Sequence, residues 1–132
     1  MTFETEGLEM MPIGFVTKQG NEIKSFSTGA IRSTDADGER WDLITPIGLR
    51  RVAATYAEGA ARYGERGWEK GMPASDLINH ALRHVYLYLA GDSSEDHLAH
   101  AVWNLLAVMH FEERQPELID IPSRHGDGTK PT

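Results

Sequence analysis

The sequence predicts an all-α fold: a helical bundle of about three main helices, completed by oligomerisation. Apolar residues recur at helical spacing in three separate stretches. Residues that start or stop helices bound each stretch. The last two stretches are separated only by the short turn at 90–94, so we expect them to form a helical hairpin. A short N-terminal β-hairpin is compatible with this plan.

Composition limits the class of protein. A chain of 132 residues forms one domain, and its net charge of -7 argues against broad binding of nucleic-acid polymers. There is no cysteine, which excludes disulfides and thiolate metal sites and suits the cytoplasm. No apolar run reaches the length of a membrane span, and the acidic N-terminus lacks the plan of a signal peptide. We therefore expect a cytoplasmic protein (host cytoplasm if phage-encoded) with no membrane partner.

The N-terminal segment, residues 1–27, has two interpretations. Ile13 and Phe15 alternate with smaller residues, 19–21 is a turn signal, and 22–27 could return as a strand. These features favour a short hairpin. A loosely ordered arm explains the segment equally well.

The remaining chain divides into a domain and a tail. We expect residues 28–114 to form a single helical domain that opens with a long loop at 28–45, rich in Gly, Ser, Thr and Asp. Residues 115–132 have no apolar period and end in several prolines and glycines, which predicts a flexible C-terminal tail.

Local signals bound the first two helices. Thr45 is the expected N-cap of the first helix, Pro46 lies in its first turn, and Gly64 ends it. The second helix is expected to begin after Ser75 as its N-cap and to end at Gly91.

The third helix is expected to follow Ser94 and to be apolar on two sides. One side carries Leu98, Val102, Leu105 and Met109. The other side carries His97, His100, Asn104, Ala107, Val108 and Phe111. A helix with two such sides needs more than one neighbour, so we expect a homodimer or homotetramer.

Four histidines occur in pairs on the two helices of the hairpin. His80 and His84 are four residues apart, and His97 and His100 are three apart, so each pair shares one helix face. The hairpin would bring the two faces together.

Three roles are open for these histidines. They could ligate a metal ion together with a carboxylate such as Asp96 or Glu58, and imidazole favours transition metals over Mg²⁺. They could instead bind phosphate oxygens with Arg83 and act as general acid–base groups near neutral pH. They could also form a structural hydrogen-bond network between helices.

A glycine-rich loop at 64–74 holds Trp68 between the cations Arg66 and Lys70. An aromatic ring flanked by cations suits a nucleobase and its phosphates. A tryptophan that covers the edge of the core is the simpler alternative. In the first helix, Gly59 would let another backbone or a ligand approach closely.

Three motifs carry a family resemblance: GAARYGERGWEKG at 59–71, ALRH at 81–84 and DHLAHAVWNLLA at 96–107. They resemble the N-terminal domain family of phage and bacterial dATP/dGTP diphosphohydrolases, over roughly residues 28–113. That family is related in concept to the MazG-like all-α nucleoside triphosphate pyrophosphohydrolases. Those enzymes dimerise into helical bundles and hold Mg or Mn with carboxylates on two helices.

The resemblance implies metal-dependent hydrolysis of a purine deoxynucleoside triphosphate to the monophosphate and pyrophosphate, with Mg or Mn as the cofactor. Because histidines stand where the family relatives carry acids, Mn or another transition metal is favoured over Mg. Trp68 or Trp103 would stack on the base. The expected catalytic residues are His84, His97, His100 and Glu58. The expected metal ligands are His80, His84, His97, His100 and Asp96. The expected substrate-binding residues are Arg62, Arg66, Trp68, Lys70, Arg83 and Asn104.

Two other classes compete with this interpretation. A phosphohydrolase of the HD type needs an adjacent His-Asp pair, and the chain offers only the reversed Asp96-His97, which argues against that class. A non-enzymatic helical module that binds nucleotide or protein would keep the histidines as a structural network.

Overall fold

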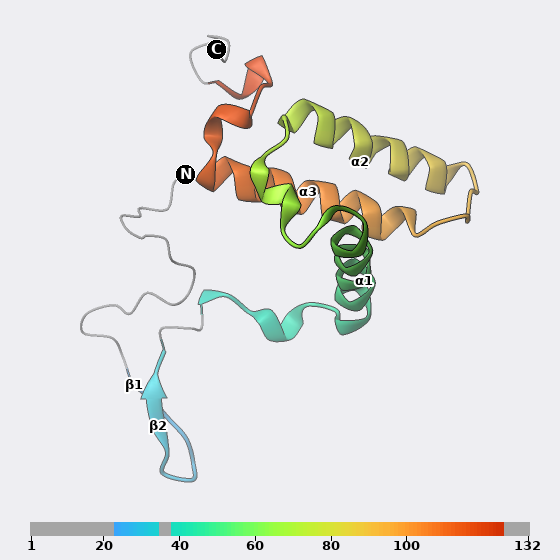
Figure 1. Ribbon diagram of the computed structural model, residues 1–132. Coiled ribbons are helices and arrows are strands. Elements are labelled where there is room, and N and C mark those ends of the chain that lie inside the picture. The colour runs from blue at the N-terminus through green and yellow to red at the C-terminus, as the bar shows by residue number, and fades with distance from the viewer. Residues whose placement is uncertain (1–22, 35–37, 126–132) are drawn as a thin grey trace. The chain divides into compact units, whose positions relative to one another are not determined.

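The structure, a computed structural model, describes residues 23–34 and 38–125 (Figure 1). The chain divides into two compact units, residues 1–44 and 45–132, and each is described by itself. The predicted all-α class with a short N-terminal hairpin is confirmed. The strands are β1 (Ile23–Ser25) and β2 (Ile31–Ser33), and the main helices are α1 (Pro46–Tyr63), α2 (Ala74–Leu89) and α3 (His97–Arg114). None of the helices in the described ranges combines the length and apolar character that a membrane span requires.

The hairpin of the first unit lies later in the chain than expected. β1 pairs antiparallel with β2, and the Phe26 amide donates to the Ala30 carbonyl across a turn in which Gly29 has φ +95°. The prediction that 28–45 is entirely loop is therefore wrong at β2, because the glycine lets the chain reverse there. The first strand expected around Ile13 and Phe15 lies outside the described residues.

The boundaries of α1 follow its local signals. The Thr45 hydroxyl accepts from the Gly48 amide at 3.1 Å, and Pro46 begins the helix. Gly64 ends it with φ +96°, a conformation that costs glycine little. The predictions for this helix are confirmed at both ends.

The start of α2 differs from the prediction. The helix begins at Ala74, and Ser75 lies inside its first turn rather than at the N-cap. The Asp120 carboxylate accepts from the Ser75 amide (2.8 Å) and hydroxyl (2.6 Å). A residue far along the chain therefore provides the acceptor for a backbone amide in the first turn of the helix. The predicted stop at Gly91 is confirmed, with φ +95°.

The core lies along the hairpin of α2 and α3, which run side by side (Figure 1). Its buried residues are Ala74, Leu77, Ala107, Phe111 and Ile119. Ile119 belongs to the segment expected to be a flexible tail. Apolar Leu118 and Ile121 pack with it against this core, so the described part of that segment is fixed; residues 126–132 lie outside the described residues.

Only one of the two apolar sides of α3 is covered. His97, Asn104 and Phe111 are buried. On the other side, exposed fractions are 38% for Leu98, 40% for Val102, 40% for Leu105 and 53% for Met109. In α1, only Val52 is buried. Self-association remains a prediction, and these side chains are the surface on which it would occur.

Candidate functional site

Three side chains form a hydrogen-bonded chain between α2 and α3. The Nδ1 atoms of His84 and His97 are 2.9 Å apart. His97 Nε2 lies 2.5 Å from Oδ2 of Asp92, in the turn that joins the helices. His97 is only 2% exposed. Hydrogen bonds from His97 and Ser94 lower the pKa of Asp92 to about 2, so its carboxylate is ionised and accepts.

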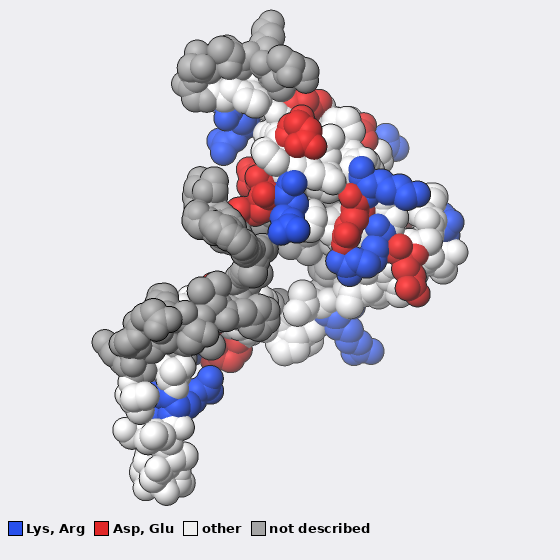
Figure 2. Space-filling view, turned by 60° about the vertical axis from the view of Figure 1, so that its left-hand side comes forward, with Lys and Arg blue, Asp and Glu red and all other residues white. Residues whose placement is uncertain are grey.

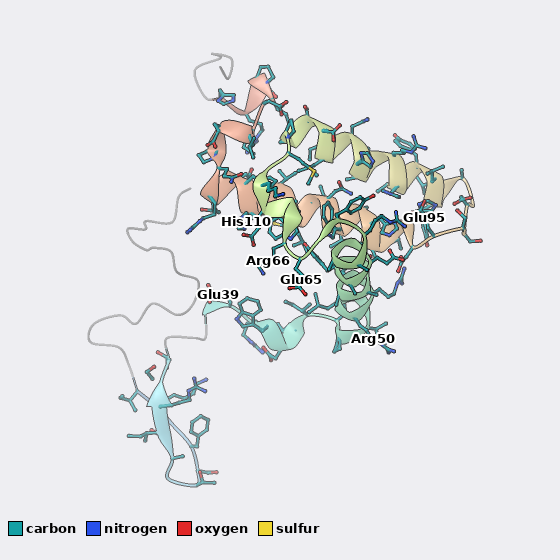
Figure 3. The ribbon with its side chains drawn as sticks, in the orientation of Figure 1. Glu39, Arg50, Glu65, Arg66, Glu95 and His110 are labelled. Atoms are coloured by element: carbon teal, nitrogen blue, oxygen red, sulfur yellow. The ribbon has the colours of Figure 1, made fainter. Side chains whose placement is uncertain are left out.

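Two further carboxylates face His100. Its Nδ1 lies 2.7 Å from Glu95 Oε1, at the start of α3 (Figure 3). Its Nε2 lies 3.6 Å from Oε1 of Glu58, which α1 contributes. The second distance is longer than a hydrogen bond. Residues from all three helices therefore converge at this end of the hairpin.

The cluster has the donors and the spacing of a metal site. One ligand atom from each of His84, Glu95 and His97 lies within 4.8 Å of the others. Two imidazoles and a carboxylate suit Mn, Fe, Co, Ni or Zn better than Mg. Asp92 holds the far nitrogen of His97, as carboxylates commonly do for metal-ligating histidines. Burial lowers the pKa of His84, which favours the neutral form that binds metal.

The structure brings together four of the residues expected from sequence: His84, His97, His100 and Glu58. His80 is exposed, with its ring centroid 6.3 Å from that of His84.

Asp96 has other partners. Both of its oxygens accept from Arg51, at 2.6 and 2.8 Å, and Oδ1 also caps α3 through the Ala99 amide. This arrangement, mainly the bond to Arg51, lowers the pKa of Asp96 to about 2. Asp96 is therefore a structural carboxylate here, and Glu95 takes the place beside the histidines.

Sequence reasoning missed Glu95 and Asp92. Asp92 falls in the predicted turn, and Glu95 falls at the predicted start of the third helix. Their proximity along the chain to His97 was the available signal. It could not show which of three neighbouring acids faces the imidazoles, because that depends on how the turn closes.

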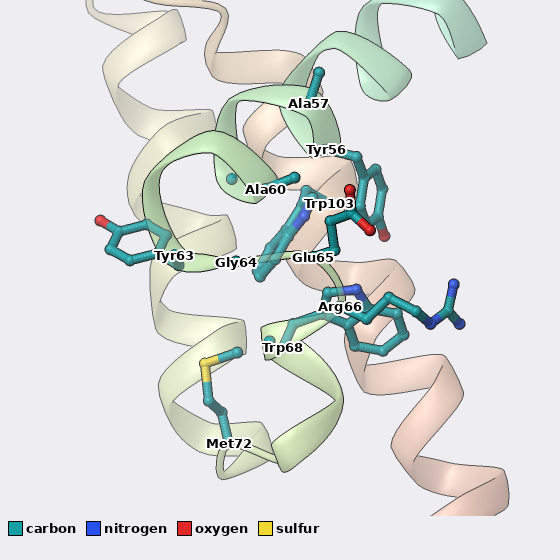
Figure 4. A pocket seen from close by; sticks show the side chains of 12 residues that line it. Tyr56, Ala57, Ala60, Tyr63, Gly64, Glu65, Arg66, Trp68, Met72 and Trp103 are labelled. Carbon is teal, nitrogen blue, oxygen red and sulfur yellow. The ribbon is translucent and has the colours of Figure 1, made fainter.

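A second feature is an aromatic cleft of about 770 Å³, lined by Tyr56, Trp68 and Trp103 (Figure 4). The Tyr56 ring lies 5.9 Å from Trp103 and 6.4 Å from Trp68, between ring centroids. Gly59 and Ala60 of α1 also line the cleft. A volume in this range suits a small organic ligand such as a nucleoside.

Trp68 lies against the core and also lines the cleft. Its ring contacts Phe111 and His110 on the core side, with centroids 6.1 and 4.9 Å apart. It also lines the cleft, where the Arg66 guanidinium carbon lies 6.0 Å from its ring centroid. Arg66 also forms an ion pair with Glu69. The cleft therefore has one cation at its rim.

The other expected substrate-binding residues lie outside the lining of the cleft. Arg62 packs on Tyr63, with the guanidinium carbon 5.8 Å from the ring centroid. Arg83 and Lys70 are exposed. Asn104 is buried and donates to the His100 carbonyl at 2.8 Å, a bond within α3.

The cleft adjoins the histidine cluster along two helices. On α1, Glu58 of the cluster precedes Gly59 of the cleft. On α3, His100 lies one turn before Trp103. The cleft and the histidine cluster are therefore lined by neighbouring residues of α1 and α3.

Comparison with known families gives an assignment that agrees with this arrangement. The family model described as dATP/dGTP diphosphohydrolase, N-terminal, matches residues 28–121. No curated protein and no solved structure matches the chain. Because the family match covers most of its length, the chain belongs to the dATP/dGTP diphosphohydrolase N-terminal family.

Proposed function

We propose that this member of the family hydrolyses purine deoxynucleoside triphosphates, dATP or dGTP, to the monophosphate and pyrophosphate with the help of a divalent metal. The observation that carries the proposal is the adjacency of two sites. A group able to ligate metal, formed by His84, His97 and Glu95, adjoins an aromatic cleft of about 770 Å³, large enough for a nucleoside.

The metal would be held by His84, His97 and Glu95, and Mn²⁺ suits these donors better than Mg²⁺. When bound, it supplies positive charge to the phosphate oxygens and acidifies a water molecule. His100 orients Glu95 through its Nδ1, at 2.7 Å. The residues that ligate and those that orient them are therefore distinct.

The remaining roles fall to the chain's own side chains. Trp68 and Trp103 would stack on the purine, and Arg66 would neutralise phosphate charge. Glu58 has a side chain that is 73% exposed, beside His100. Its carboxylate can accept a proton from a water molecule that attacks the α-phosphorus.

The proposal includes a homo-oligomer. The uncovered side of α3 carries Leu98, Val102, Leu105 and Met109, all between 38% and 53% exposed. A second copy of the chain would cover this apolar side.

The distribution of surface charge supports a nucleotide rather than a nucleic-acid polymer as the ligand. On the face shown in Figure 2, basic and acidic side chains of the helical unit are interspersed rather than gathered by sign.

The test is pyrophosphate release from each of the four dNTPs, with Mg²⁺ and with Mn²⁺. We expect release from dATP or dGTP, and its loss in Glu58→Gln and His97→Gln. His125→Gln is the matched control, because His125 bonds to the Ile119 carbonyl and lies apart from the cluster. No pyrophosphate from any dNTP with any divalent metal would overturn the proposal.

A non-enzymatic nucleotide-binding module is the second candidate. The direct contact between His84 and His97 favours it, because each ring satisfies the other without a metal. This candidate predicts purine nucleotide binding with no turnover and no bound metal. Equilibrium dialysis with Mn²⁺, alongside the pyrophosphate assay, separates the two.

A further inference from the structure

Asp92 is held more rigidly than an acidic residue in a turn requires. It follows Gly91, whose φ of +95° ends α2, and its amide donates to the Leu87 carbonyl at 3.0 Å. Its Oδ2 accepts from the Ser94 hydroxyl at 2.7 Å and the Ser94 amide at 3.3 Å. The carboxylate is therefore fixed in place before any contact with His97 is considered.

This carboxylate determines the tautomer of His97. An ionised carboxylate only accepts, so Nε2 of His97, 2.5 Å away, must carry the proton and donate it. In the neutral ring Nδ1 then has the lone pair. The His84 Nδ1 atom, 2.9 Å from it, must be the donor, which leaves the lone pair of His84 on Nε2.

We propose that Asp92 is a positioning residue that keeps the lone pair of His97 on Nδ1, the nitrogen that faces His84, and so prepares the metal site. The ligand is a divalent transition metal, and this part rests on the proposed function. The His97 side chain is 1% exposed and that of Asp92 is 40% exposed, so Asp92 is the acceptor that the buried ring meets at the edge of the fold.

The arrangement predicts a specific change on metal loading. If Nδ1 of both rings held the metal, His84 would carry its proton on Nε2 in place of Nδ1, with no net change in protons. His97 keeps its proton on Nε2, where Asp92 holds it. One ring therefore changes tautomer and the other does not.

The experiment uses the full chain labelled with ¹⁵N-histidine, in mildly alkaline buffer. Long-range ¹H–¹⁵N spectra assign the tautomer of each ring, and Mn²⁺ affinity is measured by calorimetry on the same samples. The variants are Asp92→Ala and the conservative Asp92→Asn, whose amide oxygen still accepts from Nε2. Asp76→Ala is the matched control, because Asp76 is an exposed acid in the first turn of α2.

We expect the wild type and Asp76→Ala to hold His97 as Nε2–H. Asp92→Ala should lose that single tautomer and bind Mn²⁺ about 10–100-fold more weakly, and Asp92→Asn should restore the tautomer. His97 fixed as Nε2–H in Asp92→Ala, or unchanged Mn²⁺ affinity in that variant, would overturn the proposal. A wild type that binds no Mn²⁺ would overturn the metal site of the proposed function, and the spectra would still decide the role of Asp92 toward His97.

Discussion

The α2–α3 hairpin and α1 differ in how they are held in the fold. α1 and α3 each span 18 residues, yet α3 buries residues along its whole length while α1 buries only Val52. α1 is attached through a few contacts: the Arg51–Asp96 pair and the ring of Tyr56 against Trp68 and Trp103. The hairpin helices therefore hold most of the buried residues, whereas α1 holds one.

The difference bears on function because the candidate site lies where the two regions meet. The hairpin supplies His84, His97 and Glu95. α1 supplies Glu58 and the wall of the cleft at Gly59. Changes in the hairpin should therefore affect the stability of the whole domain, whereas changes in α1 should affect chemistry and binding.

The largest expected effect is on the hairpin core. Phe111 is completely buried, so Phe111→Ala should lower the free energy of unfolding by about 3–5 kcal/mol. Urea denaturation followed by circular dichroism measures it. Leu105→Ala, on the exposed side of the same helix at 40% exposure, should cost far less. Equal losses in the two variants would contradict the assignment of the core side.

A change at Glu58 should affect turnover and leave stability nearly unchanged. Glu58→Gln should reduce turnover by roughly 100- to 10,000-fold, the range for loss of a general base, with stability within about 0.5 kcal/mol of wild type. Steady-state pyrophosphate release and a thermal melt give the two quantities. Glu112→Gln, an exposed acid on α3, is the control that should retain activity. Full activity in Glu58→Gln would exclude this residue as the base.

The uncovered side of α3 should mediate self-association. Leu105→Glu places a charge there and should weaken association by roughly 30-fold or more, as for a central interface residue. Sedimentation equilibrium is the measurement. Arg83→Glu changes an exposed residue of α2 and should leave association unchanged. A monomeric wild type would contradict self-association through this side of α3.

Asp96 links the two regions, and its effect should depend on pH. Asp96→Ala removes the N-cap of α3 and the partner of Arg51, which should cost about 0.5–2 kcal/mol at neutral pH. The pair is partly exposed, so the ion pair itself adds little.

The sign of the pH dependence follows from the lowered pKa. Asp96 ionises at about 2 in the folded protein against an ordinary 3.8, so its stabilisation is complete above about pH 4 and is lost as pH falls toward 2. Urea titrations from neutral to acidic pH should show the wild type and Asp96→Ala converging. A difference that is undiminished at pH 2 would contradict this account.

A small gain in stability is expected from a substitution in the cleft. A Cβ added at Gly59 would meet no atom within 4 Å, so Gly59→Ala should fold normally and raise stability by about 1 kcal/mol through helix propensity. Gly59→Leu should also fold but weaken purine nucleotide binding by occupying the cleft. Ala61→Leu adds the same side chain outside the lining and should bind normally. Tryptophan fluorescence titrations with a non-hydrolysable dNTP analogue compare the binding of Gly59→Leu with that of Ala61→Leu.

Local signals in the sequence were sufficient to predict much of the fold. Thr45, Pro46, Gly64 and Gly91 bound the helices as expected, because caps depend on neighbours within one turn. Ser75 did not act as a cap, because Asp120 reaches that helix end from 45 positions away. A bond of that kind leaves no periodic signal in the sequence.

The site was predictable in part for the same reason. Helical spacing was enough to group His84, His97 and His100, whereas the choice among Asp92, Glu95 and Asp96 depended on tertiary contacts. Arg51 from α1 takes Asp96 out of the cluster, and His100 holds Glu95 in it. In the segment after α3, the burial of Ile119 had no signal in the sequence, because a single isoleucine forms no regular pattern.

The products of the reaction test the central claim most directly. We predict that ³¹P spectra of the wild-type protein with Mn²⁺ and dATP or dGTP will show deoxynucleoside monophosphate and pyrophosphate appearing in equal amounts. Inorganic phosphate or intact triphosphate as the product, or no turnover of either purine nucleotide, would contradict the claim that the histidine cluster and the aromatic cleft form one pyrophosphohydrolase site.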